Sequence, residues 1–264
     1  MKLSIIIPSY KDSLLVKTIN SLLENSELGD QIEIIAVLDG YWPSFELVQD
    51  PRVRYIHLGK NVGMRRAINA GVAISRGEFI MRADEHQMFG KGYDRILTET
   101  CEDNWIVTPR RYALDVVKWE IMDEIPVVEF MKLKIQDCGN GIRKFSGVEA
   151  PGNVEQRIQE SMAMQGSCWL MKRSWWDKVI GELQNEGYGP HYQDSHEMVF
   201  KTWQNGGKLM VNKDTWHAHK HRSFPRTHNN GTKENPSNNE QCWTYSLSVW
   251  EDYYTKEILP KWHI

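Results

Sequence analysis

Short apolar runs alternate with amphipathic stretches through the first part of the chain. Two of the amphipathic stretches, residues 13–24 and 63–75, repeat their apolar residues with helical spacing. Pro8 directly follows the first apolar run and is expected to end it, because proline cannot donate a hydrogen bond to a sheet. The alternation predicts an α/β fold with a Rossmann-like, doubly wound and mostly parallel sheet. The predicted strands cover residues 3–7, 32–38, 53–58 and 78–81.

The pattern becomes less regular after residue 115. Residues 116–160 mix short apolar runs with prolines and glycines, and we expect them to form an excursion over the functional site. Residues 222–241 are rich in asparagine and poor in apolar groups, which is typical of a mobile loop. An aromatic-rich helix is expected to follow near the carboxyl terminus. Further strands are predicted at residues 167–171 and 209–211, and further helices at residues 175–183, 196–203 and 242–258.

Composition narrows the class of protein. The 264 residues suffice for one large domain or two closely fused halves, and a hydrophobic content of 41% supports a sizeable core. The net charge of -3 gives no overall electrostatic case for binding nucleic acid or a membrane. No segment approaches the ~18 apolar residues of a membrane span, and the first apolar run is too short for a signal peptide. Four cysteines without paired spacing predict free thiols in a reducing compartment, and hence a cytoplasmic protein.

Candidate chemistry gathers where three of the predicted strands end. The carboxyl ends of parallel strands form one crevice, and ligands of such sheets bind there. Asp84 and His86 lie two residues apart in an extended stretch, so their side chains point to the same side. A carboxylate and an imidazole so placed can hold a divalent cation, and the cation can hold a diphosphate. The strand-end segments are Pro8-Ser9-Tyr10, Asp39-Gly40 and Asp84-Glu85-His86.

A third candidate ligand lies far downstream, where His217, His219 and His221 alternate along the chain. In a strand all three imidazoles would face one side, although one of them is enough to complete the site. Imidazole ligands favour Mn²⁺ over Mg²⁺. The pattern therefore predicts a metal-dependent transferase that uses a nucleotide-sugar donor.

An ordered series of motifs carries a family resemblance. Residues 5–10 read Ile-Ile-Ile-Pro-Ser-Tyr, residues 61–71 contain Gly-Met-Arg-Arg-Ala, and residues 197–207 end in Trp-Gln-Asn-Gly-Gly. Together with the segments at 33–40, 84–86, 165–171 and 216–219, this series resembles family 2 glycosyltransferases with the GT-A fold. Several motifs are more similar to those of polypeptide N-acetylgalactosaminyltransferases. The chain departs from the usual pattern at the end of the second strand, where Leu38 replaces the first of two aspartates.

The resemblance implies a division of roles along the chain. Residues 1–115 would bind the nucleotide sugar, which we expect to be a UDP-sugar. Residues 116–264 would form the acceptor and catalytic half, with residues 222–241 as a lid over the donor. Mn²⁺ or Mg²⁺ would be held by Asp84, His86 and His219, with His217 and His221 left solvated. The donor contacts so implied are Pro8, Ser9, Tyr10, Asp39, Arg66, Asp84, Gly166, Ser167, Arg222 and His228.

Two carboxylates are candidates for catalysis. Asp194 occupies the position at which family 2 enzymes place their catalytic base, and it is the best base if the reaction inverts the anomeric centre. In retaining relatives the corresponding carboxylate positions the acceptor or the sugar instead. Glu197 lies three residues further on and could share the same face of a helix start. The metal motif favours retention and Asp194 favours inversion, so both outcomes stay open.

The acceptor is also left open by the sequence. A glycan, a protein or a modified base in DNA, as in some phage enzymes, would each fit a hydroxyl acceptor. A nucleotidyltransferase uses a similar sheet, but residues 8–12 do not resemble its glycine-rich phosphate loop. A third alternative is a protein that binds a nucleotide sugar without transferring it. The full set of candidate ligands favours the enzyme, whose oligomeric state the sequence does not indicate.

Overall fold

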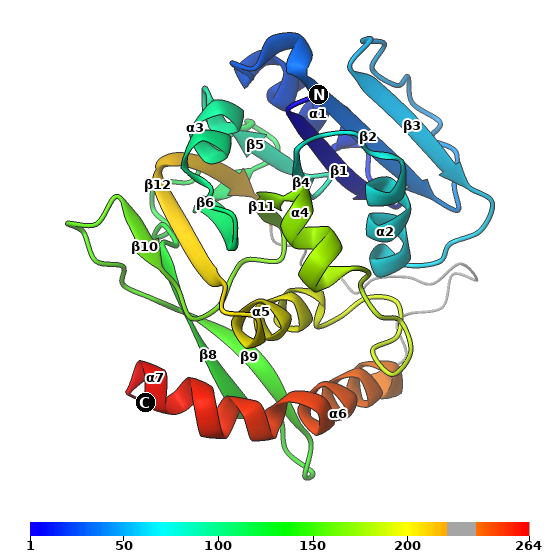
Figure 1. Ribbon diagram of the computed structural model, residues 1–264. Coiled ribbons are helices and arrows are strands. Elements are labelled where there is room, and N and C mark those ends of the chain that lie inside the picture. The colour runs from blue at the N-terminus through cyan, green and yellow to red at the C-terminus, as the bar shows by residue number, and fades with distance from the viewer. Residues whose placement is uncertain (221–235, 264) are drawn as a thin grey trace.

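The computed structural model describes residues 1–220 and 236–263. One mixed sheet of ten strands runs through this part of the chain, with helices on both of its faces (Figure 1). The order along the sheet is β10-β12-β6-β11-β4-β1-β2-β3, while β5 pairs with β12 and β7 pairs with β6. The N-terminal part of the chain contributes four strands to this sheet. They are β1 (Leu3–Ser9), β2 (Ile32–Asp39), β3 (Val53–Leu58) and β4 (Phe79–Ala83).

These four strands are all parallel to one another. Every position of β2 is buried, as expected for a parallel strand that is covered on both faces. Strand β1 continues through Pro8 to Ser9, so the expectation that proline ends it is wrong. The ladder between β1 and β4 stops at Ile6, which leaves a flank of β1 where proline's missing N–H costs no hydrogen bond.

Alternation along β1 explains why the sheet is covered on both faces. Leu3, Ile5 and Ile7 belong to one apolar cluster, which also contains the buried face of α1. Ile6 points the other way and belongs to the second cluster, together with Ala67 of α2. The doubly wound arrangement predicted from the sequence is confirmed. The helices of this half are α1 (Leu15–Asn25), α2 (Met64–Ile74) and α3 (Tyr93–Thr100).

The second half of the sheet is mixed. Strand β11 lies between β4 and β6 and runs antiparallel to both, so β4 and β6 point in the same direction. Strand β12 is parallel to β6 and extends well beyond the expected residues 209–211. A bulge between Asn212 and Trp216, in a polar part of the strand, hid that length from the apolar pattern. The strands are β5 (Gln87–Phe89), β6 (Trp105–Asp115), β7 (Glu120–Ile121), β10 (Ile158–Glu160), β11 (Cys168–Lys172) and β12 (Lys208–His219).

The expected excursion contains a separate two-stranded hairpin, β8 (Phe130–Asp137) and β9 (Arg143–Ala150). It packs against the C-terminal helix α6 (Figure 1). Helix α6 begins at Pro236, so the last six residues of the expected loop 222–241 are helical, and residues 221–235 lie outside the described part. The helices of this half are α4 (Arg173–Trp175), which continues as a π-helical turn over Trp176–Ile180, α5 (Asp194–Gln204), α6 (Pro236–Tyr253) and α7 (Leu259–Trp262).

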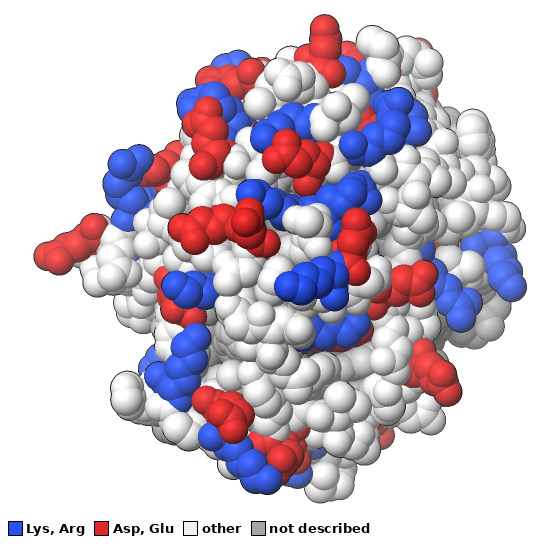
Figure 2. Space-filling view, viewed as in Figure 1, with Lys and Arg blue, Asp and Glu red and all other residues white. Residues whose placement is uncertain are grey.

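The C-terminal helix belongs to the core. Trp250 is 8% exposed, stacks on Phe200 with ring centroids 5.1 Å apart, and donates from Nε1 to the Tyr188 hydroxyl at 2.6 Å. None of the helices in the described ranges is both long and apolar enough to cross a membrane. On the face drawn in Figure 2, side chains of both charges are interspersed, in keeping with the small net charge.

Candidate active site

The carboxyl ends of β1, β2, β4, β6 and β12 lie at one edge of the sheet, the position of the predicted crevice, because all five strands run in the same direction. Ser9 ends β1, Asp39 ends β2, and Asp84 directly follows β4. Strand β12 ends at His219, which pairs with Gln87 of β5. This pairing brings His219 next to the turn that carries Asp84 and His86.

Asp84, His86 and His219 come together as the sequence predicts. One side-chain ligand atom from each of them lies within 4.8 Å of the others. His219 Nε2 is 3.3 Å from Asp84 Oδ2, and the two imidazole rings have centroids 5.0 Å apart. One carboxylate and two imidazoles form a donor set that suits a borderline divalent cation such as Mn²⁺.

A second carboxylate fixes the orientation of His86. Its Nδ1 lies 3.1 Å from Asp12 Oδ2, in the loop before α1. A histidine that ligates a metal commonly has its other ring nitrogen held by a carboxylate in this way. Glu85 lies beside the pair and accepts a hydrogen bond from the backbone N–H of Tyr10 at 2.9 Å. The contact with Asp12 leaves His86 Nε2 as the ring nitrogen available to a cation.

Asp84 is ionised by its surroundings. Burial acts to raise the pKa of this carboxyl, but the positive charge of Arg82 and the hydrogen bond to His219 outweigh burial and hold the pKa well below its usual range. Arg82 Nη2 donates to Asp84 Oδ1 at 2.7 Å. The charged form is the one that binds a metal. The residues present therefore fit the cation that the resemblance implies.

Gly166 and Ser167 lie beside this cluster, because Cys168 of β11 pairs with Ala83 of β4. The Ser167 hydroxyl oxygen is buried and has no hydrogen-bond partner among the described residues. A buried hydroxyl of this kind usually has a partner, so a polar ligand would complete it. A Cβ added to Gly166 would lie 3.4 Å from the Ser195 Cβ, an ordinary contact, so the backbone here does not require glycine.

The ends of β1 and β2 carry the other expected donor contacts. The hydroxyls of Ser9 and Tyr41 are 2.5 Å apart, and the Tyr10 ring meets the Tyr41 ring edge-on at 5.9 Å. Burial raises the pKa of Tyr41 to about 12, so its phenol is neutral at physiological pH. Pro8 lies within β1, one residue before this pair.

Asp39 is engaged by the loop that leads into α2. Its carboxylate accepts hydrogen bonds from the backbone N–H groups of Val62 at 2.7 Å and Gly63 at 2.9 Å, and from Asn61 Nδ2 at 2.9 Å. Burial raises the pKa of this carboxyl in spite of those bonds. In this structure Asp39 therefore holds residues 61–63, the loop that leads into α2.

The two neighbouring arginines of α2 have different environments. Arg66, the expected phosphate contact, is exposed on the helix surface. Arg65 is fully buried and pairs with Glu197, which is 1% exposed. Glu197 also accepts from Lys201 at 2.7 Å, so its carboxylate serves a buried ion-pair network away from the cation cluster. Asp194 is placed differently, since its Oδ2 accepts from Arg82 Nη1 at 2.7 Å.

Of the two histidines that flank His219, only His217 lies in the described part of the chain, and it differs from its expectation. His217 is fully buried and stacks on Phe89 with ring centroids 6.2 Å apart, so the prediction that it is solvated is wrong. Strand β5 pairs with this end of β12 and sets Phe89 directly opposite His217, a pairing that the alternating pattern alone did not indicate. His221 and the two expected lid contacts, Arg222 and His228, lie outside the described residues.

Sequence reasoning missed three polar residues: Asp12 and Arg82, which contact the cation cluster, and Arg65, which pairs with the candidate catalytic residue Glu197. Arg82 lies two positions before Asp84 in an otherwise apolar strand, and this spacing was a usable signal. Arg65 lies three positions before the buried Ile68, so helical spacing distinguishes it from Arg66. Asp12 gives no such signal, because its contact with His86 depends on the tertiary fold.

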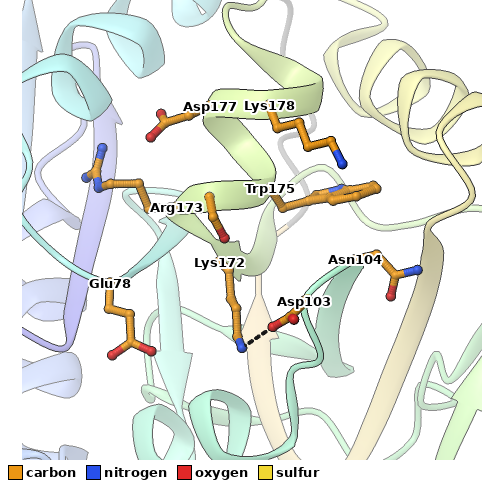
Figure 3. Close-up of a pocket in the computed structure, with 9 residues that line it drawn as sticks. Glu78, Asp103, Asn104, Lys172, Arg173, Trp175, Asp177 and Lys178 are labelled. Carbon is orange, nitrogen blue, oxygen red and sulfur yellow. Dashed lines mark hydrogen bonds and ion pairs between the residues drawn. The ribbon is translucent and has the colours of Figure 1, made fainter.

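A separate pocket of about 730 Å³ opens at the opposite, amino ends of β4 and β6 (Figure 3). Two of its three cationic residues are already engaged, since Lys172 pairs with Asp103 and Arg173 Nε donates to the Gly77 carbonyl at 2.9 Å; the third is Lys178. Trp175 contributes a flat ring to the wall. The pocket shares no residue with the crevice and lacks its cluster of cation ligands, so we assign the chemistry to the crevice.

Comparison with known proteins agrees with this architecture. The sequence profile of glycosyl transferase family 2 matches residues 4–180. None of the curated protein sequences compared with the chain matches significantly. Among solved structures, a crystal structure of GalNAc-T7 with UDP, GalNAc and Mn²⁺ superposes with a TM-score of 0.74 at 16% identity, over 98% of this chain and 50% of that one. The chain thus spans half the length of this structural neighbour. The GT-A fold expected from the sequence is confirmed, and the chain belongs to glycosyltransferase family 2.

Proposed function

We propose that the protein transfers a sugar from a UDP-sugar to a hydroxyl acceptor, with Mn²⁺ or Mg²⁺ held by Asp84, His86 and His219. The observation that carries this proposal is the convergence of these three ligands, one from the end of β12 and two from the turn between β4 and β5, where the parallel strands end. When bound there, the cation would neutralise the charge that develops on the departing diphosphate. The GalNAc-T7 structure contains both UDP and Mn²⁺, which supports the same pairing of ligand and ion here.

The residues of the chain would then divide the work. Ser9 and Tyr10 would contact the base of the UDP-sugar at the end of β1. The unpartnered Ser167 hydroxyl would form a hydrogen bond with the UDP-sugar beside Asp84. Asp39 would act indirectly, by fixing the loop before α2. Arg66 is exposed and could reach a phosphate only from the surface of α2. Arg222 and His228 stay expectations for the donor lid.

Asp194 is the better placed of the two candidate catalytic carboxylates. It shares Arg82 with the cation ligand Asp84, whereas Glu197 is turned into the buried network of Arg65 and Lys201. We therefore propose that Asp194 acts on the acceptor or the sugar, as a base if the reaction inverts and as a positioning group if it retains. Glu197 would support the site through α5.

The acceptor class is not distinguished by the contacts described above. A glycan, a protein and a modified base in DNA all remain candidates, and an uncharged hydroxyl is the feature they share. Four free cysteines support a reducing compartment such as the cytoplasm as the place of action.

A screen of UDP-sugars for release of UDP in the presence of Mn²⁺ tests the proposal. Activity should vanish in EDTA and fall more than ~100-fold in Asp84→Ala and His219→Ala, because direct ligands matter at least as much as the groups that orient them. Asp103→Ala is a matched control, since its side chain is exposed and lies at the amino end of β6, at the opposite edge of the sheet, and it should keep full activity.

Three results would contradict the proposal. Undiminished UDP release in EDTA would remove the cation from the mechanism. Release of pyrophosphate from UTP and a sugar phosphate, without UDP release from UDP-sugars, would favour a nucleotidyltransferase. Binding of UDP without turnover of any sugar donor would favour a protein that only binds nucleotide sugars.

A further inference from the structure

One arginine lies between two carboxylates of the candidate site. Arg82 belongs to β4 and is 3% exposed. Its Nη2 donates to Asp84 Oδ1 and its Nη1 donates to Asp194 Oδ2, each at 2.7 Å. Asp84 follows β4, while Asp194 begins α5, more than a hundred positions along the chain. A single guanidinium therefore joins the cation cluster to the acceptor-side helix.

The guanidinium has a fixed orientation. Positions 82 and 84 point to the same side of an extended chain, which brings the arginine under the carboxylate. Met64 Sδ lies 2.9 Å from Arg82 Nη2, and a Cβ added to Gly166 would lie only 3.7 Å from Nη1. The planar fork of an arginine can donate to two separate carboxylates at once, which a lysine ammonium cannot do with the same geometry.

This contact decides which oxygen of Asp84 faces the cluster. Oδ1 is engaged by Arg82, and Oδ2 lies 3.3 Å from His219 Nε2. Without Arg82 the carboxylate could rotate, and neither oxygen would be held toward the imidazoles. Substitution of Arg82 would also leave Asp194 without this cationic partner.

We propose that Arg82 is a positioning residue that holds Asp84 for cation binding and couples it to Asp194. On this account the affinity for the cation depends on Asp194, although Asp194 is not one of the three candidate ligands. The inference rests on the proposed function, because it takes Asp84, His86 and His219 as the cation site. It adds that a change at Asp194 alters cation binding at Asp84 through the Arg82 side chain.

Charge and geometry predict opposite results when Arg82 is removed. If Arg82 acted only as a nearby positive charge, its removal would strengthen the binding of a divalent cation. If it orients the ligand, its removal weakens binding, and loss of a group that orients a metal ligand typically costs about 10–100-fold in affinity. The sign of the change therefore distinguishes the two roles.

The experiment is a titration of the full chain with Mn²⁺ alone, in which the EPR signal of free Mn²⁺ gives the dissociation constant without a need for turnover. Arg82→Gln and Arg82→Lys are both expected to weaken binding by about 10–100-fold. Arg143→Gln is the matched control, because Arg143 forms an exposed two-pronged pair with Glu251, and it should bind Mn²⁺ as the wild type does. Unchanged or tighter binding by Arg82→Gln would overturn the proposal.

The coupling is tested by a double-mutant cycle with Asp194→Asn. Asp194→Asn should weaken Mn²⁺ binding when Arg82 is present and have a clearly smaller effect in the Arg82→Gln background, because the link is then already broken. Equal effects in both backgrounds would contradict the coupling. The double variant also removes one positive and one negative charge together, which protects the fold, and thermal unfolding in EDTA identifies any variant that fails to fold.

The outcome also separates this inference from the proposed function. If the wild type binds neither Mn²⁺ nor Mg²⁺, the cation site itself is wrong and both proposals fail. If the wild type binds Mn²⁺ and Arg82→Gln binds it equally well, the cation site stands and only the role of Arg82 is overturned.

Discussion

Two of the candidate cation ligands are held by side chains that are not ligands themselves. Asp12 lies 3.1 Å from His86 Nδ1, and Arg82 donates to Asp84 at 2.7 Å. Such contacts reduce the number of orientations that a ligand can adopt before the ion arrives, so less ordering is required on binding. The sequence identified Asp84 and His86 from their spacing and His219 from the family resemblance, but the groups that orient them follow from contacts between distant segments.

His217 is a buried histidine that lies outside the proposed ligand set, unlike the candidate cation ligand His219. It is fully buried, and burial, together with the nearby His219, lowers its pKa well below the usual 6.5. The imidazole is therefore neutral in the folded protein, while the unfolded chain takes up a proton as the pH falls below about 6.5. Because the unfolded state then binds more protons, His217 should make the protein less stable as the pH falls.

We predict that His217 contributes a loss of stability of up to about 1.4 kcal/mol per pH unit below pH 6.5, the limit for one proton. His217→Phe should reduce that slope, since it keeps an aromatic ring against Phe89 and removes the titrating group. Urea denaturation in EDTA at several pH values between 5 and 7.5 measures the slope for both proteins. Identical slopes would mean that His217 is protonated, or equally neutral, in both states.

At the scale of elements, helices α2 and α5 are joined through a buried ion pair. Arg65 Nη1 donates to Glu197, and the same guanidinium donates from Nη2 to the Tyr192 carbonyl at 2.8 Å. Arg65 is 0% exposed and Glu197 is 1% exposed. A charge buried to this extent is tolerated because it is paired and hydrogen-bonded, and it becomes costly when its partner is removed.

We predict that Arg65→Met lowers the free energy of unfolding by about 3–5 kcal/mol, because it leaves the buried Glu197 carboxylate with Lys201 as its one cationic partner among the described residues. The double variant Arg65→Met with Glu197→Gln should recover part of that loss. Chemical denaturation measures both values. Arg143→Met, which breaks an exposed pair, should cost no more than about 1 kcal/mol, and an equally small loss for Arg65→Met would contradict the account.

The elements that the sequence predicted well are those whose apolar residues form one continuous signal. Strands β1, β2 and β4 and helices α1 and α2 were found within a few residues because each is buried along a whole face, and β3 was found although it is only partly buried. Strand β6 and the hairpin β8–β9 were missed because polar and apolar residues mix in them, and their burial depends on partners far along the chain. The length of β12 was missed for the same reason.

The candidate site was predicted to a similar extent. Asp84, His86 and His219 were brought together by the direction of the parallel strands, a property that strand order alone can indicate. Glu197 and Arg66 were placed by motif position, and the fold puts the first in a buried network and the second at the surface. Which side of a helix faces a partner is decided by packing, and the motif does not contain that information.

For the whole molecule, the parallel half of the sheet and the C-terminal half meet at one crevice. Residues at the ends of β1, β2 and β4 form its proposed donor side, while β12 supplies His219 and α5 supplies Asp194. Arg82 contacts groups from both halves. The central claim is therefore geometric, namely that one cation binds where residues from β12, and from the turn between β4 and β5, meet.

A crystal grown with UDP and Mn²⁺, with diffraction collected at the manganese absorption edge, tests that claim most directly. The account predicts an anomalous peak within about 2.0–2.3 Å of Asp84, His86 and His219 side-chain atoms, with the diphosphate of UDP on its open side. UDP bound in the crevice with manganese at other residues, or with no manganese near these three, would contradict it.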